Sequence, residues 1–186
     1  GILYREVGEK MICYKGFNKN LCCTMGRGTM QYEVGKTYTA ESAKTANTGL
    51  HCVEEPIEVL RWYPDGRYCI VAAEGDINES DDKIACTQMR ILKEINKKTL
   101  AMLQCEWMME HPDRKYSDKV KKDIGTADPG DIVVVYGRSP KAQGGIGSLI
   151  CMVKKGRDGF NAGAYLIDGK RYKPDVYYRV DGRQAR

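Results

Sequence analysis

The chain has 186 residues, of which 42% are hydrophobic and 30% charged, and its formal net charge is +5. Such a chain can bury one ordinary core or two small ones, and its composition is not that of a disordered protein. It contains no run of about 18 apolar residues and no apolar segment at its start, so we expect neither a membrane span nor a signal peptide. We therefore expect a cytoplasmic protein.

The eight cysteines are expected to be buried free thiols. Cys69 lies in the apolar run YCIV and Cys151 in LICMV, where a thiol acts as a small hydrophobic side chain. A zinc site would need paired ligands such as two CxxC motifs, and the chain offers only the neighbours at 22–23 and 51–52. We therefore predict no metal site and no structural disulfide.

The first half of the chain predicts mainly strands. Residues 11–14 form a short apolar run, and 31–38 alternates polar and apolar residues around Gly35. Two acidic residues followed by Pro56 predict the start of a helix, because proline suits its first turn. Residues 67–73 are the clearest strand.

An acidic stretch at 74–82 predicts a solvated loop. Asp76, Asn78 and Ser80 stand at alternate positions, as ligands of a calcium loop do, but the glycine and the final glutamate of such a loop are missing. Residues 84–95 predict another strand. The spacing of Leu100, Leu103 and Trp107 predicts a helix over 96–111.

The second half predicts a polar linker at 113–125 and then four strands, at 131–136, 149–153, 164–167 and 176–180. We expect an α+β fold with a mixed, mostly antiparallel sheet, two to three helices and a β-rich C-terminal module. The expected domains are 1–112 and 126–186, which may also share one core.

Charge is distributed unevenly along the chain. Residues 1–135 hold 19 basic and 21 acidic residues, a net charge of −2, whereas residues 136–186 hold 11 and 4, a net charge of +7. A basic module attracts polyanions, nucleic acid first, although it can also be only a solvated face. Basic residues interleaved with tyrosines are typical of nucleic-acid contacts. The candidate binding residues are Arg138, Lys141, Lys154, Lys155, Arg157, Lys170, Arg171, Lys173, Tyr177 and Arg179.

Motifs for catalysis are few. There is no GxSxG, HExxH, Walker loop or GxGxxG motif. The glycine-rich segment 144–147 could expose backbone N–H groups to a phosphate, but a β-turn or a β-solenoid corner explains it equally well. His51 lies between Leu50 and Cys52. Cysteine–histidine catalysis would need a thiolate beside this imidazole, and a buried structural histidine is the alternative.

A series of short motifs in the first half resembles a known family. They are YKGF at 14–17, QYEVGK at 31–36, GLHC at 49–52 and PxxVLxxY at 56–63, and a tail DGKxxKPDxYY follows at 168–178. Their order is similar to that of a domain of unknown function common in bacteriophage and prophage proteins. The resemblance covers most of residues 12–95 and 131–182. It implies no activity.

Two functional hypotheses follow from these patterns. The first is a non-catalytic phage or mobile-element protein, in the bacterial cytoplasm, that counters host defence in the manner of an anti-CRISPR. Its partner would be a nuclease ribonucleoprotein, another bacterial protein or nucleic acid, reached through the basic module.

The alternative hypothesis is an enzyme that uses NAD, because the order of motifs is also loosely similar to that of ADP-ribosyltransferases. That resemblance implies Tyr14 and Gly16 at the cofactor, Tyr63 stacking on it and Gln88 at the ribose, with His51 as a further candidate catalytic residue. The chain departs from the resemblance because it has no clear catalytic set of Arg or His, Ser-Thr-Ser and Glu-x-Glu.

Overall fold

The computed structural model describes residues 10–23, 29–43, 49–80 and 83–186. The chain divides into two compact units, 1–96 and 97–186, and each has a hydrophobic core of its own. This division differs from the one expected from the sequence, because helix α1 (Lys97–Glu110) packs on strands of the second unit. The N-terminal segment and the turn expected at 26–28 lie outside the described residues.

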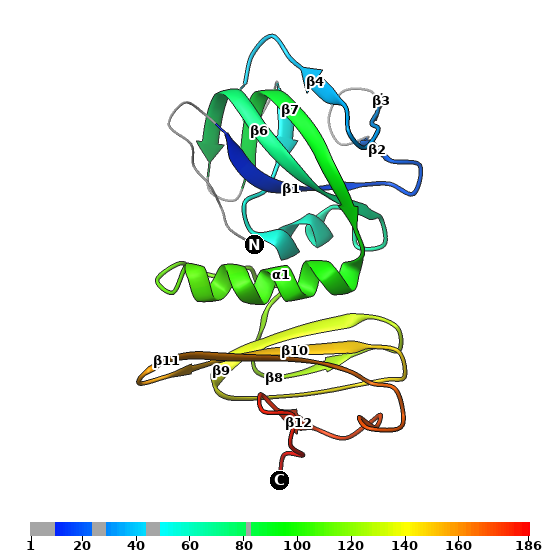
Figure 1. Ribbon diagram of the computed structural model, residues 1–186, viewed down its shortest axis with the longest axis vertical. Helices are drawn as coiled ribbons and strands as arrows, with labels where there is room; N and C mark the ends of the chain where they lie inside the picture. The colour runs from blue at the N-terminus through cyan, green and yellow to red at the C-terminus, as the bar shows by residue number, and fades with distance from the viewer. Residues whose placement is uncertain (1–9, 24–28, 44–48, 81–82) are drawn as a thin grey trace. The chain divides into compact units, whose positions relative to one another are not determined.

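The first unit is built on an antiparallel sheet (Figure 1). Its strands are β1 (Met11–Phe17), β4 (Thr37–Thr39), β5 (Leu50–Cys52), β6 (Arg67–Ser80) and β7 (Lys83–Ile95). The order is β1-β6-β7-β4, and β5 pairs with another part of β7. The strands expected at 11–14, 67–73 and 84–95 are therefore confirmed, and each is longer than the sequence pattern indicated.

The strands of the first unit close on themselves. The backbone N–H of Tyr14 donates to the carbonyl of Val53 and the N–H of Val53 to the carbonyl of Tyr14, each at 2.8 Å. Because β5 also pairs with β7, the chain forms a closed ring of strands β1-β6-β7-β5. Its core holds apolar side chains from every strand: Cys13, Phe17, Leu21, Tyr32, Leu50, Cys52, Cys69, Val71, Ala73, Ile84, Cys86, Met89 and Ile91.

Short elements complete the first unit. β2 (Cys22–Cys23) and β3 (Met30–Gln31) form a two-stranded ribbon. The helix expected at Pro56 is present as the 3₁₀ helix η1 (Pro56–Arg61), with proline in its first turn. Glu58 is buried in it and accepts two hydrogen bonds of 3.0 Å from the Arg61 guanidinium, which satisfies the buried carboxylate.

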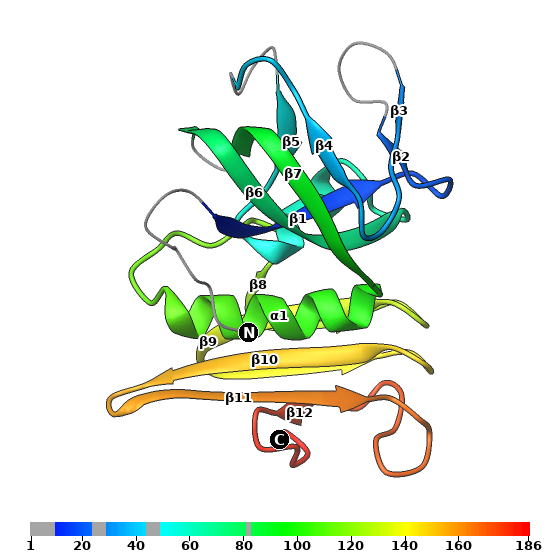
Figure 2. The ribbon, with the colours of Figure 1, turned by 45° about the horizontal axis from the view of Figure 1, so that its top comes forward.

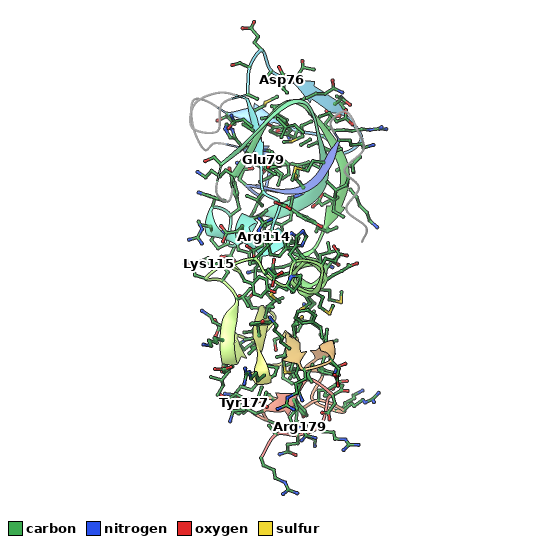
Figure 3. The ribbon with its side chains drawn as sticks, turned by 90° about the vertical axis from the view of Figure 1, so that its left-hand side faces the viewer. Asp76, Glu79, Arg114, Lys115, Tyr177 and Arg179 are labelled. Atoms are coloured by element: carbon green, nitrogen blue, oxygen red, sulfur yellow. The ribbon has the colours of Figure 1, made fainter. Side chains whose placement is uncertain are left out.

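The expectation of a solvated loop at 74–82 is wrong for residues 74–80, because β6 continues to Ser80. The register with β7 shifts between Glu74 and Ile77. At this bulge the N–H of Asp76 donates to the hydroxyl of Thr87 at 2.9 Å. The acidic residues Asp76 and Glu79 therefore stand on a strand, as Figure 3 shows.

The second unit places α1 along one face of a sheet and β12 on the other side of it (Figure 2). Its strands are β8 (Lys121–Ala127), β9 (Ile132–Gly144), β10 (Leu149–Gly156), β11 (Gly159–Leu166) and β12 (Tyr178–Arg179). The helix expected over 96–111 is confirmed. The expected linker at 113–125 is wrong at its end, because β8 begins there.

Two of the strand pairings in this sheet are parallel and have the geometry of a short coil. Ile132 lies opposite Leu149, and Ile124 lies opposite Lys141, so in both places the chain returns beside itself after 17 residues. The corners before the returning strands stack, and the N–H of Gly130 donates to the carbonyl of Ile146 at 3.0 Å. The segment 144–147 therefore leads through a β-turn, closed by the N–H of Ser148 and the carbonyl of Gly145 at 3.1 Å, and this turn forms a solenoid-like corner stacked on the turn before β9.

Strand β10 stabilises the second unit through contacts on both of its faces. All five residues 149–153 are buried, as expected for a strand covered on both faces. Ile150 and Met152 join the core on one face, and Cys151 contacts Cys105 of α1 on the other. Strands dominate the whole fold and helices are few, so the α+β class holds only in its coarser sense.

All eight cysteines are free thiols. Six are buried, and Cys22 and Cys23 are partly buried. Burial raises the pKa of the Cys69 thiol to about 12. The expectation that most of the thiols are buried hydrophobic groups is confirmed.

Candidate nucleic-acid interface

The ten candidate binding residues all lie in the second unit, but they form two groups. Lys154, Lys155 and Arg157 lie at the hairpin between β10 and β11, and Lys154 stands opposite Gly137, the neighbour of Arg138. The second group lies around β12 and the loop before it. It consists of Lys141, Lys170, Arg171, Lys173, Tyr177 and Arg179.

The loop with Lys170 and the hairpin with Lys154 lie at opposite ends of β10. Leu149 starts this strand next to Ser148, whose carbonyl accepts a 2.9 Å hydrogen bond from Ile167, just before the loop with Lys170. Lys154 lies five residues further along, or about 17 Å at the rise of a β-strand. The candidate residues therefore do not make one compact site.

The β12 group lies on an outward-facing surface of three neighbouring strands. Lys141 of β9 stands opposite Ile124 of β8 on one side and opposite Arg179 of β12 on the other. The next residues, Ala142 and Tyr178, face each other and are buried. Because side chains alternate along a strand, Lys141 and Arg179 point outward.

We call this surface the β12 platform. A second row adds Gln143, whose amide donates to the Thr126 hydroxyl at 3.3 Å, and Tyr177, the residue before β12 (Figure 3). The platform therefore combines two cations, an aromatic ring, an aliphatic side chain and two polar groups, and none of its members is acidic. Its members are Ile124, Thr126, Lys141, Gln143, Tyr177 and Arg179.

The charges on the platform are only partly compensated. The Lys141 ammonium lies 5.2 Å from the centre of the Tyr177 ring, a cation–π distance. Arg179 donates to Asp181 at 3.2 Å, and Arg183 approaches the same carboxylate at 3.9 Å. The backbone N–H of Arg183 and the two guanidinium charges hold the pKa of Asp181 below its usual value. One carboxylate thus serves two arginines, and within the described ranges no carboxylate forms an ion pair with Lys141.

The loop that precedes the platform is ordered by its own residues. Asp168 accepts backbone hydrogen bonds from Lys170 at 2.8 Å and Tyr172 at 3.1 Å, which lower the pKa of this carboxyl. The Tyr172 ring packs between those of Tyr165 and Tyr178. Tyr172 therefore packs against the core, whereas Lys170, two residues earlier, is exposed and can meet a ligand.

The residues of the enzyme hypothesis lie on three strands of the first unit. Tyr14 and His51 lie on the neighbouring strands β1 and β5, joined beside them by the Tyr14–Val53 bridge. Gln88 lies on β7, three residues from Ala85, which stands opposite His51. Its amide donates to the Glu74 carboxylate at 2.7 Å.

The space at Gly16 is occupied by Tyr63, since an added Cβ would meet the ring at 2.8 Å. The NAD-using alternative stays a prediction. Among the described residues no group of three or more metal-binding side chains is placed to hold a metal ion.

Lys15 is a further candidate functional residue, which the sequence motifs did not indicate. Only 5% of it is exposed, and its ammonium donates to the His51 carbonyl at 2.6 Å. The rings of Phe17 and Tyr32 lie 5.7 and 5.3 Å away, and the Cys23 thiol lies at 3.9 Å. The strand period could have revealed it, because Lys15 shares one face of β1 with the apolar Cys13 and Phe17.

Ile124, Thr126 and Gln143 were also missed. They join the platform only through the parallel register of β8 and β9, for which the sequence holds no local signal.

Comparison with known proteins gives a family. A family model described as a domain of unknown function, DUF7666, matches residues 11–103. The chain therefore belongs to the DUF7666 family. The match covers the first unit and part of α1, whereas the β12 platform lies beyond it.

No curated protein and no solved structure matches the chain. No helix among the described residues is long and apolar enough to cross a membrane.

Proposed function

We propose that this protein is a non-catalytic binding protein whose second unit holds nucleic acid, either free or within a nuclease ribonucleoprotein. The observation that carries the proposal is the charge of that unit. Residues 97–186 contain 18 basic and 11 acidic residues, a net charge of +7, whereas residues 1–96 contain 12 and 14, a net charge of −2. A positive surface of this kind attracts phosphates and releases their counterions.

The arrangement of the basic residues supports the same proposal. Nine of the ten candidate residues are lysines or arginines whose side chains are exposed or half-exposed, and the tenth, Tyr177, lies at cation–π distance from one of them. Side chains that only solubilise a surface need no aromatic neighbour. Two separate basic groups, one at the hairpin after β10 and one around β12, also suit an extended polyanion better than a small ligand.

We further propose that this binding serves a phage or other mobile element against host defence, in the bacterial cytoplasm, as an anti-CRISPR-like inhibitor does. The support is the phage-type order of motifs in the sequence. A protein of this kind would occupy the nucleic-acid channel of a nuclease ribonucleoprotein.

The proposal is tested by titrating fluorescein-labelled oligonucleotides with the full chain and following anisotropy. Two triple variants reverse three charges each: Lys154→Glu, Lys155→Glu, Arg157→Glu, and Lys170→Glu, Arg171→Glu, Lys173→Glu. The matched control reverses three exposed charges of the first unit: Lys19→Glu, Arg90→Glu, Lys93→Glu. We expect both second-unit variants to lose at least tenfold in affinity and the control to lose little.

Equal losses in all three variants would show that only total charge matters and would contradict a site in the second unit. The inhibitor role is tested separately by adding the protein to a CRISPR ribonucleoprotein and following cleavage of target DNA. Unimpeded cleavage at a large excess of protein would remove that part of the proposal. Calorimetry with millimolar NAD tests the enzyme alternative, which predicts heat that is lost in Tyr14→Ala and Gln88→Ala.

A further inference from the structure

The β12 platform resembles in its chemistry a surface on which bases stack. Proteins that bind single strands place an exposed aromatic ring beside cations that meet the phosphates, often on the open face of a sheet. Tyr177 supplies the ring, and Lys141 and Arg179 supply two cations on neighbouring strands. Buried residues hold the neighbouring strands in register, so the sheet fixes the spacing of these three side chains.

The register itself is unusual for a surface without a ligand. Lys141 and Arg179 stand directly opposite each other, and like charges at such positions destabilise a pair of strands. The Asp181 carboxylate lies 3.2 Å from the Arg179 guanidinium and reduces this repulsion. Arg183, however, shares the same carboxylate. A phosphate between the two cations would remove the remaining repulsion.

The polar members of the platform fit the edges of bases. Gln143 and Thr126 donate and accept hydrogen bonds next to the Lys141 row. Ile124 is 46% exposed beside Lys141 and offers an apolar contact to a base or sugar. In a duplex the base faces are covered by neighbouring pairs, so only a strand with unstacked bases can use the ring and the apolar surface together.

We propose that the β12 platform binds single-stranded nucleic acid, with an unpaired base stacked on Tyr177 and the adjoining phosphates held by Lys141 and Arg179. This inference rests on the proposed function and narrows it to one class of nucleic acid. The ligand displaces the Lys141 ammonium from its position over the ring toward a phosphate. The basic hairpin with Lys154, which is separate from the platform, then meets another part of the same nucleic-acid chain.

The test uses the full chain with a 20-nucleotide oligothymidine and a 20-base-pair duplex, in the same buffer, followed by anisotropy. The single strand binds more tightly. Tyr177→Leu lowers single-strand affinity about tenfold, as removal of one base stack does, whereas Tyr177→Phe keeps it. Duplex affinity is the same in all three proteins. Thermal unfolding of each variant shows whether the platform still folds.

Lys141→Ala has a different signature. It lowers the slope of log affinity against log salt by about 0.7, the value for one phosphate on a single strand, whereas Tyr177→Leu leaves that slope unchanged. A 2-aminopurine base in the oligonucleotide reports stacking directly, since its fluorescence changes with the wild type and not with Tyr177→Leu.

The possible outcomes distinguish a failure of the stacking inference from a failure of the proposed function. Equal affinity for strand and duplex, or a Tyr177→Leu variant that folds and binds like the wild type, overturns the stacking inference and leaves the proposed function standing. A protein that binds neither oligonucleotide overturns both.

Discussion

Lys15 lies in an environment that is costly for a cation. It is buried among the side chains of the first core, and its ammonium has one short hydrogen bond, to the His51 carbonyl. No carboxylate of the residues that the structure describes forms an ion pair with it. Taking such an ion out of water costs several kcal/mol. Leaving the carbonyl without its donor costs only about 1–3 kcal/mol. The desolvation of the ammonium is therefore the larger effect.

We accordingly expect Lys15→Met to be at least as stable as the wild type, because methionine fills the space without the charge. Lys15→Ala is the control and should lose about 2–3 kcal/mol, since it leaves a cavity. Urea unfolding of the two variants measures the difference. A methionine variant as unstable as the alanine variant would mean that the hydrogen bond from the Lys15 ammonium to the His51 carbonyl is needed to stabilise the contact of β1 with β5.

The Arg67–Glu94 pair makes stability depend on pH. The guanidinium donates to both carboxylate oxygens, at 2.8 and 2.6 Å, and holds the pKa of Glu94 below its ordinary value of 4.5. A depressed pKa stabilises the folded state above the unfolded pKa, and this stabilisation is lost as the pH falls through the folded one. The pair is more than a third exposed, so its contribution should be only about 0.5 kcal/mol.

Arg67→Gln should therefore be less stable than the wild type at pH 7, and the difference should disappear well below pH 4.5. Urea unfolding at a series of pH values checks this. A difference that stays constant to pH 2 would assign the effect of Arg67 to packing.

At the scale of elements, the solenoid corner at 144–147 depends on glycine. Gly147 has a φ of 80°, and this left-handed conformation costs other residues about 1–2 kcal/mol. An added Cβ has room there, since its nearest neighbour is 3.7 Å away. Gly147→Ala should thus lose about 1 kcal/mol by conformation alone. Gly156→Ala, also without a clash, is the matched control and should change stability little.

The limits of sequence-based prediction also appear at this scale. Strands with strong apolar patterns, such as 67–73 and 149–153, were predictable because burial dictates their composition. β8 was not, because its side chains are mostly exposed and its pairing depends on the 17-residue return of the chain. The candidate basic residues were found by composition, whereas their separation into two groups follows from the register of β10 with β9 and β11.

At the scale of the whole molecule, the two units carry opposite net charges, −2 and +7. The family match lies mainly on the first unit, and the features that suit nucleic acid lie on the second. We therefore propose that residues beyond the family domain bind nucleic acid. This proposal leaves the first unit, with its buried Lys15, to a separate role.

The salt dependence of binding tests this assignment most directly. The affinity of the full chain for oligothymidine is measured by anisotropy from 50 to 300 mM salt, for the wild type and for the Lys170→Glu, Arg171→Glu, Lys173→Glu and Lys19→Glu, Arg90→Glu, Lys93→Glu variants. The account predicts a steep negative slope of log affinity against log salt that becomes about two units shallower only in the second-unit variant, since each lost phosphate contact removes about 0.7. The same reduction in both variants, or a flat slope in the wild type, would contradict it.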